Sequence, residues 1–266
     1  MTQRDKLQRF RDLHAAGTFV MPNPHDIGTA RLLAALGFDA LATTSAGFAA
    51  SLGQLDMTVT RDQLVDHVRT IAVATDLPLN VDAERCFPDQ PGGITRTVEL
   101  LSEAGAAGCS IEDWNPVDQR IEPIETAVER VVEAVTAAKR VGLVLTARAE
   151  NHIRGVDDFE DTILRVTSYA AAGVDCVYAP GLTDLAKIKR LVDESGAPVN
   201  ILLLPGGPTV AQLTDLGVRR ISLGSGLSNI AFGAFAKAAK RLLEEGVLGT
   251  DEPFLTRDLS KKAFRS

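Results

Sequence analysis

Residues 101–113 read LSEAGAAGCSIED, and this stretch decides the fold. It joins the apolar end of a helix, a glycine (Gly105) where helices commonly end in a left-handed turn, and a short apolar strand that finishes on Glu112 and Asp113. The same helix-to-strand junction recurs in LGFDAL (36–41), AAGVDCVY (171–178) and LGVRRISL (216–223). One junction repeated along a chain predicts alternating helices and parallel strands.

The alternation runs through the whole sequence. Apolar or β-branched runs predict strands at 18–21, 40–44, 78–84, 108–113, 143–148, 175–180, 199–204 and 219–224. Amphipathic segments predict helices at about 26–36, 60–75, 93–104, 124–140, 157–172, 182–195, 208–216 and 227–245. Eight strand–helix units predict an α/β protein of the (β/α)8 TIM barrel class. A doubly wound open sheet is the competing architecture, but no GxGxxG follows the first strand.

Length and composition limit the number of domains, the possible partners and the state of the cysteines. No Pro/Ser-rich linker divides the 266 residues, so one barrel domain over 1–266 with a C-terminal helical extension is expected. The formal net charge of −7 argues against nucleic acid as a partner. No apolar run reaches the roughly 18 residues of a membrane span, and the N-terminus lacks a signal-peptide core, so we expect a cytoplasmic protein with no membrane partner. The three cysteines, Cys86, Cys109 and Cys176, have no CxxC spacing and are expected to be free thiols.

Polar side chains gather where the predicted strands end, which is where (β/α)8 barrels place their chemistry. The second strand ends in Thr44, Ser45, Ala46 and Gly47, the third in Asp82 and Glu84, the fourth in Glu112 and Asp113, and the fifth in Arg148, Glu150 and Asn151; the seventh strand begins with Asn200. Asp82 and Glu84 are two residues apart, so we expect both carboxylates to point to the same side of their strand.

The acids suit a hard divalent cation. Asp82, Glu84 and Glu112 come from adjacent strands, with Asp56 in the loop after the second strand, and carboxylate oxygens are the ligands that Mg²⁺ prefers; Mn²⁺ is an alternative. Each acid alone is equally well a solvated strand end or a helix cap, but their convergence favours a metal site.

Arg148 ends an otherwise apolar strand, where a buried charge needs a partner. Its planar fork fits a substrate carboxylate, and a salt bridge to Glu112 or Glu150 is the alternative; both can hold. The small residues Thr44 to Gly47 admit a carboxylate to backbone N–H groups, or form only a tight turn.

Taken together, the motifs TSAGFAASLGQLD, VDAE, IED, LTARAEN and PVNILLLPGG, in this order, resemble the isocitrate lyase/phosphoenolpyruvate mutase superfamily. The resemblance spans residues 21 to about 245. It implies a (β/α)8 barrel whose eighth helix is exchanged with a neighbouring subunit, a homo-oligomer (dimer or tetramer), and Mg²⁺ that chelates an α-keto acid or enolate while a C–C or P–C bond is broken or formed.

The resemblance also implies roles for single residues. Asp82 resembles the direct metal ligand, and the other acids of the metal shell act mostly through water. We expect Thr44, Ser45, Ala46, Gly47, Arg148 and Asn200 to bind substrate, Asp82, Glu84, Glu112 and Asp56 to hold the metal, and Arg148, Glu112 and Asp56 to take part in catalysis.

The departures from the superfamily pattern limit the substrate. Lyases for isocitrate or 2-methylisocitrate carry a KKCGH loop with a catalytic cysteine, but residues 112–123 read EDWNPVDQRIEP, which argues against that route. The phosphonopyruvate enzymes show a lysine and an asparagine on this loop. Here only Asn115 is present, and Asp118, Glu122 and Glu125 are expected to repel a phosphonate.

Three residues nearby have open roles. Glu84 stands where the superfamily more often has aspartate, and its extra methylene should shift the outer-shell carboxylate and the waters that it holds. Cys86 is expected to be a packing residue, with a relocated catalytic thiol as the alternative. Trp114 is either a lid over the site or a hydrophobic plug.

The sequence therefore predicts a Mg²⁺-dependent lyase or decarboxylase that cleaves a C–C bond in a small, oxaloacetate-like α-keto acid through a metal-stabilised enolate. Two alternatives stay open: P–C chemistry on phosphonopyruvate, and a barrel that binds an α-keto acid without turnover. The general acid or base of loop 114–125 is not identified by the sequence.

Overall fold

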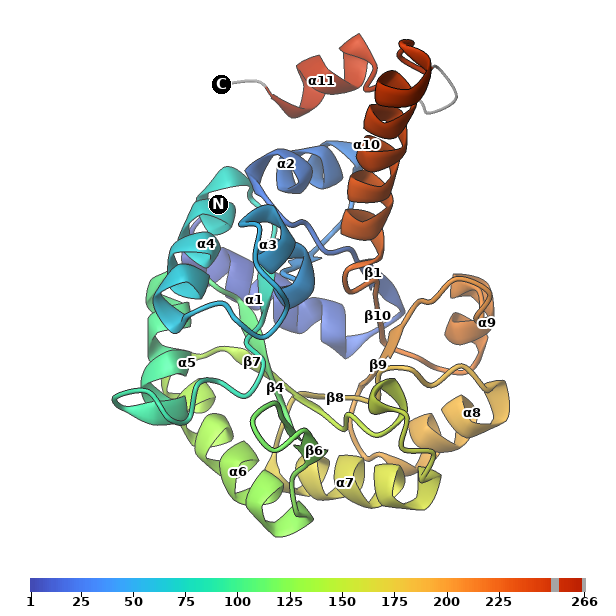
Figure 1. Ribbon diagram of the computed structural model, residues 1–266. Helices are drawn as coiled ribbons and strands as arrows, with labels where there is room; N and C mark the ends of the chain where they lie inside the picture. The colour runs from blue at the N-terminus through green and yellow to red at the C-terminus, as the bar shows by residue number, and fades with distance from the viewer. Residues whose placement is uncertain (250–253, 265–266) are drawn as a thin grey trace.

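Eight parallel strands form a nearly closed barrel in the computed structural model, which describes residues 1–249 and 254–264 (Figure 1). The strands are β1 (Phe19–Met21), β2 (Leu41–Ala42), β3 (Leu79–Asp82), β4 (Gly108–Glu112), β7 (Val144–Arg148), β8 (Cys176–Tyr178), β9 (Val199–Leu202) and β10 (Arg220–Ser222). Hydrogen-bonded neighbours follow the order β1-β10-β9-β8-β7-β4-β3-β2. The remaining seam is bridged where the Ala42 N–H donates to the Pro22 carbonyl at 3.0 Å, so the predicted barrel is confirmed.

Each strand is followed along the chain by at least one helix. The helices are α1 (Gln3–Ala15), α2 (Ile27–Leu36), α3 (Ser45–Ser51), α4 (Arg61–Ala74), α5 (Gly93–Glu103), α6 (Ile124–Val141), α7 (Phe159–Ala172), α8 (Leu185–Glu194), α9 (Val210–Asp215), α10 (Gly226–Glu245) and α11 (Arg257–Ala263). All eight predicted helices are present within a few residues of their expected ends. The sequence did not predict α1, α3, α11, the hairpin of β5 (Trp114–Asn115) and β6 (Arg120–Ile121), or the 3-10 turn η1 (His152–Arg154).

Successive side chains of each strand point alternately outward, beneath the helices, and inward, into the barrel. The outward side chains, such as Val81, Ile111 and Ile221, are fully buried in the apolar layer beneath the helices. The inward side chains are largely polar, namely Asn80, Asp82, Ser110, Glu112, Thr146, Arg148, Tyr178, Asn200, Arg220 and Ser222. Barrel interiors are commonly filled with Val, Ile and Leu. This interior is therefore arranged as a binding site over most of its depth.

Helix α1 closes the N-terminal end of the barrel. Phe10 and His14 on this helix and Phe19 on β1 make edge-to-face contacts, with ring centroids 4.7 Å apart for Phe10–His14 and 5.2 Å for His14–Phe19. Gly108 faces this cluster. A Cβ atom on Gly108 would lie 2.7 Å from both Phe10 Cε1 and the Val144 carbonyl, so the floor has no room for a side chain there.

Helix α10 projects away from the barrel instead of covering it (Figure 1). Ser228 is its only buried residue, and Ile230, Phe235 and Leu243 are 69%, 75% and 87% exposed. Helix α11 returns to contact α2. The exchange of this helix with a neighbouring subunit, and the homo-oligomer it implies, stay predictions. Within residues 1–249 and 254–264, no helix has the length and apolar character needed to cross a bilayer.

Substitution of Gly108 tests the packing of the barrel floor. Gly108→Ala should lower the free energy of unfolding by about 2 kcal/mol, because the new methyl overlaps Phe10 and strand β7. Gly28→Ala on α2 is the matched control, since its Cβ would meet only Asp26 Oδ1 at 3.5 Å; alanine there should be neutral or slightly stabilising. Urea unfolding measures both, and a Gly108→Ala protein as stable as the parent would show that the floor is loosely packed.

Candidate functional site

A cavity of about 210 Å³ opens at the carboxyl ends of the strands. Most of the predicted site residues line it, namely Thr44, Ser45, Ala46, Asp56, Asp82, Glu112, Arg148 and Asn200. Gly47 and Glu84 do not. The residues predicted from the strand ends and the loops beside them thus come together from six separate segments of the chain, and their individual roles stay predictions.

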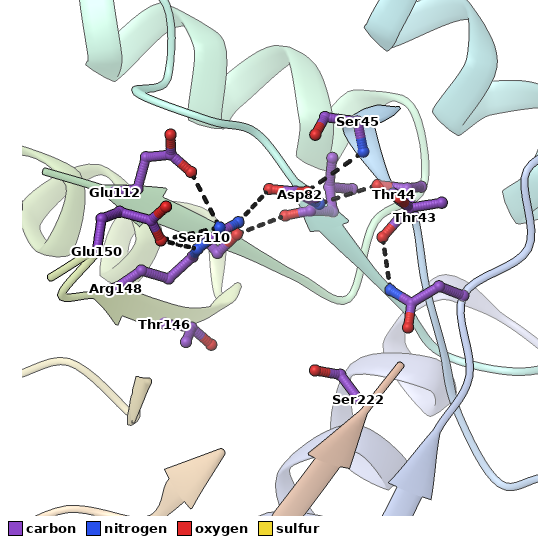
Figure 2. Close-up of polar contacts among 12 residues, drawn as sticks. Thr43, Thr44, Ser45, Asp82, Ser110, Glu112, Thr146, Arg148, Glu150 and Ser222 are labelled. Carbon is purple, nitrogen blue, oxygen red and sulfur yellow. Dashed lines mark hydrogen bonds and ion pairs between the residues drawn. The ribbon is translucent and has the colours of Figure 1, made fainter. Parts of the chain in front are cut away.

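Arg148 lies at the centre of the charged groups (Figure 2). Its Nη1 is 2.7 Å from Asp82 Oδ1, and its Nη2 is 2.9 Å from Glu150 Oε1 and 3.2 Å from Glu112 Oε2. The three acids come from the ends of β3 and β4 and from the segment after β7. The sequence left two partners open for Arg148, a substrate carboxylate or a salt bridge to Glu112 or Glu150. The salt bridge is present, and binding of a substrate carboxylate is compatible with it.

Two carboxylate oxygens in this cluster have no hydrogen-bond donor. Glu112 Oε1 and Glu150 Oε2 are both buried and unpartnered, and the nearest cation is Arg154, with Nη2 3.6 Å from Glu112 Oε1 and Nε 3.4 Å from Glu150 Oε2. Burial and the neighbouring charge of Glu150 raise the pKa of Glu112 well above its usual range. Unpartnered buried oxygens are uncommon in proteins and fit a hard cation or its bound water.

The acids are spaced too widely to grip an ion as a compact set. Among the residues that the structure describes, no three His, Cys, Asp or Glu side chains are grouped closely enough to hold a metal ion together. This spacing fits the expectation of one direct carboxylate ligand with the others acting through water, which is how Mg²⁺ is commonly bound.

Asp82 is held by the segment after β2. Its N–H donates to Thr43 Oγ1 at 2.9 Å, and its Oδ2 accepts from the Ser45 N–H at 3.3 Å (Figure 2). The segment expected to be a loop is the first turn of α3, with Thr44 as its N-cap. Gly47 lies on the opposite side of this turn, where a Cβ would come within 2.8 Å of Ser228 Oγ on α10, so its small size serves helix packing.

Glu84 does not share the cavity of Asp82, contrary to the alternation expected from the sequence. Strand β3 ends at Asp82, and Glu84 has a φ of 50°, so the chain turns before the alternation can continue. Glu84 lines an adjoining cavity of about 280 Å³, together with Met57 and Phe87. Burial, followed by the charges of Asp82 and Asp56, raises the pKa of Glu84 to about 8.

Backbone strain is concentrated beside these two cavities. Among residues 1–249 and 254–264, five residues other than glycine have positive φ angles, and four of them belong to the two loops that border the site: Met57, Glu84, Cys86 and Phe87. Such conformations are costly for residues with a Cβ and cluster at functional sites.

The hairpin at 114–121 turns its polar groups away from the cavity. Asn115 Oδ1 accepts from the N–H groups of Val117 and Asp118, which folds its side chain back onto the hairpin. Glu122 is buried and bonded to Arg85 and Arg130. The expected repulsion of a phosphonate by Asp118 and Glu122 is therefore not supported, because neither carboxylate lines the cavity.

Trp114 contributes neither a lid nor a plug. Its ring lies beside Arg154, whose Cζ is 4.5 Å from the ring centroid. The stacking holds the Arg154 side chain next to Glu112 and Glu150 at the rim of the cavity.

Tyr178 is a cavity residue that sequence reasoning missed. It is the last residue of β8, and the Arg148 Cζ lies 5.4 Å from its ring centroid. Burial raises its pKa to about 12, so the phenol keeps its proton at neutral pH. The rule that found the acids, reading what each strand ends on, also leads to Tyr178 once the search is not limited to charged residues.

Asp113 holds Glu150 from behind the cavity. Asp113 Oδ1 accepts from the Glu150 N–H at 2.9 Å, while Oδ2 accepts from the Tyr169 hydroxyl at 2.6 Å and from Arg165 at 3.2 Å. These buried bonds fix the chain segment that follows Arg148.

This geometry can be compared with that of known proteins. Residues 10–243 match the phosphoenolpyruvate phosphomutase family. The chain belongs to this family. The superfamily predicted from the strand-end motifs is therefore confirmed, and the protein falls among the lyases and mutases of that superfamily.

Several relatives of this family member are similar over most of their length. A candidate lyase/mutase from Burkholderia cenocepacia J2315 has a crystal structure with a TM-score of 0.91 and 43% identity, covering 97% of this chain and 95% of that one. The 2-methylisocitrate lyase of Salmonella typhimurium is 29% identical over 77% of this chain and 72% of its own. The oxaloacetate decarboxylase of Paraburkholderia xenovorans is 30% identical over 95% of this chain and 86% of its own.

The three thiols should be chemically silent in the folded protein. Cys86, Cys109 and Cys176 are fully buried, and burial raises the pKa of each. We expect no reaction with Ellman's reagent on the minute scale for the native protein and three reactive thiols in denaturant. Rapid native labelling of one thiol, or a loss of about a thousandfold in turnover in a folded Cys86→Ser variant, would make Cys86 a relocated acid or base.

Proposed function

We propose that this chain is a Mg²⁺-dependent lyase or decarboxylase that cleaves a C–C bond in a small, oxaloacetate-like α-keto acid. The carrying observation is the Arg148 guanidinium shared by Asp82, Glu112 and Glu150 in a polar cavity at the carboxyl end of the barrel. This arrangement sets a carboxylate-binding fork directly beside oxygen ligands for a cation. Similarity to an oxaloacetate decarboxylase over 95% of the chain supports the substrate class.

The donor set fits Mg²⁺, or Mn²⁺ with the same ligands. Asp82 would be the direct ligand, and Glu112 and Asp56 would act through water; Glu84 lines the adjoining cavity and is no longer assigned to this shell. When bound, the ion supplies a Lewis acid that polarises the keto oxygen of the substrate.

The side chains of this protein would bind and orient the acid. Asp82, Glu112 and Glu150 already occupy most of the Arg148 N–H groups, so Arg148 offers a substrate carboxylate its positive charge and its remaining N–H on Nη1. The segment Thr44 to Ala46 borders the cavity with small side chains, which leaves space close to the backbone. Asn200, buried on β9, offers an amide at the opposite wall.

Proton delivery to the enolate is assigned to Tyr178. Its hydroxyl group carries a proton at neutral pH, as in an ordinary tyrosine, and its ring lies beside Arg148 in the cavity. Water in the cavity is the alternative donor. The hairpin at 114–121 presents no side chain to the cavity that can take this part.

Two other functions have specific support. P–C chemistry on phosphonopyruvate is favoured by the phosphoenolpyruvate phosphomutase match and by Asp118 and Glu122 being turned away from the cavity. A barrel that binds an α-keto acid without turnover is compatible with a hairpin that lacks lysine and cysteine. We place C–C cleavage first because no lysine is available on residues 112–125 to bind a phosphonate.

A substrate panel tests the proposal. Mg²⁺-loaded protein should consume oxaloacetate and lose that activity in EDTA, while 2-methylisocitrate should be inert for want of the loop cysteine. Turnover of phosphonopyruvate in place of oxaloacetate would replace the proposal with P–C chemistry. If ¹³C NMR shows that oxaloacetate binds but no product forms, the protein is a barrel that binds an α-keto acid without turnover.

Removal of the Tyr178 hydroxyl tests the proton donor. Tyr178→Phe should lower kcat by about a hundredfold or more, because a positioned general acid contributes about 10²–10⁴ to the rate. Affinity for oxalate, which needs no proton, should be nearly unchanged. Tyr169→Phe is the matched control, since this buried hydroxyl bonds to Asp113 and does not line the cavity; it should cost stability more than rate. Full activity of Tyr178→Phe would assign the proton to water.

A further inference from the structure

Arg220 is a buried cation without a carboxylate partner. It begins β10, is 2% exposed and lines the floor of the cavity. Ion pairs with at least one carboxylate hold the other buried arginines, Arg85 and Arg165, and also the part-buried Arg148. Among residues 1–249 and 254–264, no carboxylate oxygen lies within 4.0 Å of an Arg220 nitrogen.

Neutral acceptors hold the Arg220 guanidinium in place. Its Nε donates to Asn200 Oδ1 at 2.9 Å, and its Nη2 donates to Thr146 Oγ1 at 2.8 Å. Its Nη1 lies 3.2 Å from His14 Nε2. His14 Nδ1 is 2.7 Å from the Phe10 carbonyl, which only accepts, so Nδ1 carries the proton and Nε2 is an acceptor.

His14 does not add a charge to this group. Burial, followed by the charge of Arg220, lowers the pKa of His14 to about 3, so the imidazole is neutral at physiological pH. The positive charge of Arg220 therefore reaches the cavity floor without local compensation.

The fold itself gives no reason for this charge. A buried guanidinium without a counter-ion is unfavourable, and an apolar side chain of similar shape commonly raises stability at such a position. The rest of the floor is already apolar and closely packed around Phe10 and Phe19. Residues that cost stability without structural benefit are found where a ligand supplies the missing partner.

Arg220 also decides which way the Asn200 amide points. A guanidinium has no acceptor, so Asn200 must turn Oδ1 toward Arg220. The amide nitrogen then faces Ser222, to whose Oγ it donates at 3.0 Å, and its second N–H is left for another acceptor. Both Asn200 and Ser222 line the cavity.

We propose that Arg220 is a positioning residue for an anionic ligand: its uncompensated charge favours an anion in the cavity, and its bond to Asn200 Oδ1 orients the Asn200 amide as a donor toward that anion. This inference rests on the proposed function, because it takes the ligand to be a small carboxylate.

Arg220→Met tests this role with two readouts that do not depend on turnover. The probe is oxalate, titrated by calorimetry in the presence of Mg²⁺, and stability is read from thermal unfolding. We expect Arg220→Met to bind oxalate at least about tenfold more weakly, with a smaller fall in unfolding temperature than Arg165→Met, because only neutral acceptors lose their donor. Arg165→Met is the matched control: its removal leaves the buried Asp113 unpaired, so the unfolding temperature should fall.

Each outcome decides the inference. Unchanged oxalate affinity in a folded Arg220→Met protein would overturn it, and so would weaker binding joined to a loss of stability as large as that of Arg165→Met, since a damaged floor would explain both. Oxalate binding that depends on Arg220 in a protein that turns over no keto acid would sustain the inference and overturn the proposed lyase activity. A parent protein that binds no oxalate would overturn both.

Discussion

The shared guanidinium of Arg148 is the interaction on which the site depends. It joins the ends of β3, β4 and β7 by contacting Asp82, Glu112 and Glu150, none of which is more than one-fifth exposed at its side chain. Three carboxylates so close together would repel one another without a cation between them. The same constraint explains the function we propose, because acids that need positive charge are ready to share a metal ion and an arginine with an anionic substrate.

The shell around this cluster is built from further paired charges. Asp113 fixes the Glu150 backbone and is held by Tyr169 and Arg165, while Glu122 ties the hairpin to Arg85 and Arg130. Removing one member of such a buried pair leaves the other uncompensated, which is strongly destabilising. The positions of Glu150 and of the hairpin are thus fixed by residues that do not line the cavity of Arg148. Arg220 is the exception to this pairing.

Much of the architecture was predictable because its signals are local. Glycines such as Gly105 and Gly173 mark helix ends, and the apolar runs that follow them are the strands. Reading the strand ends and the loops beside them also placed eight of the ten predicted site residues at the cavity. Helix α3 was missed because small residues resemble a turn, although Thr44 is a good N-cap. Glu84 was placed in the wrong cavity because a positive φ at a glutamate has no sequence signal. Arg220 was missed because its direction follows from its pairing with Asn200 across β9 and β10, a long-range register.

The central claim is that the acids at the barrel mouth form a divalent cation site used with an anionic ligand. Calorimetric titration of Mg²⁺ in the presence of oxalate, for the parent protein and for Asp82→Asn, tests it most directly. We expect a single Mg²⁺ site in the parent and an affinity at least about tenfold weaker in Asp82→Asn, with the fold intact by circular dichroism, because the amide removes the charge of the proposed direct ligand. Equal affinity in the two proteins, or a parent that binds no Mg²⁺, would contradict the claim.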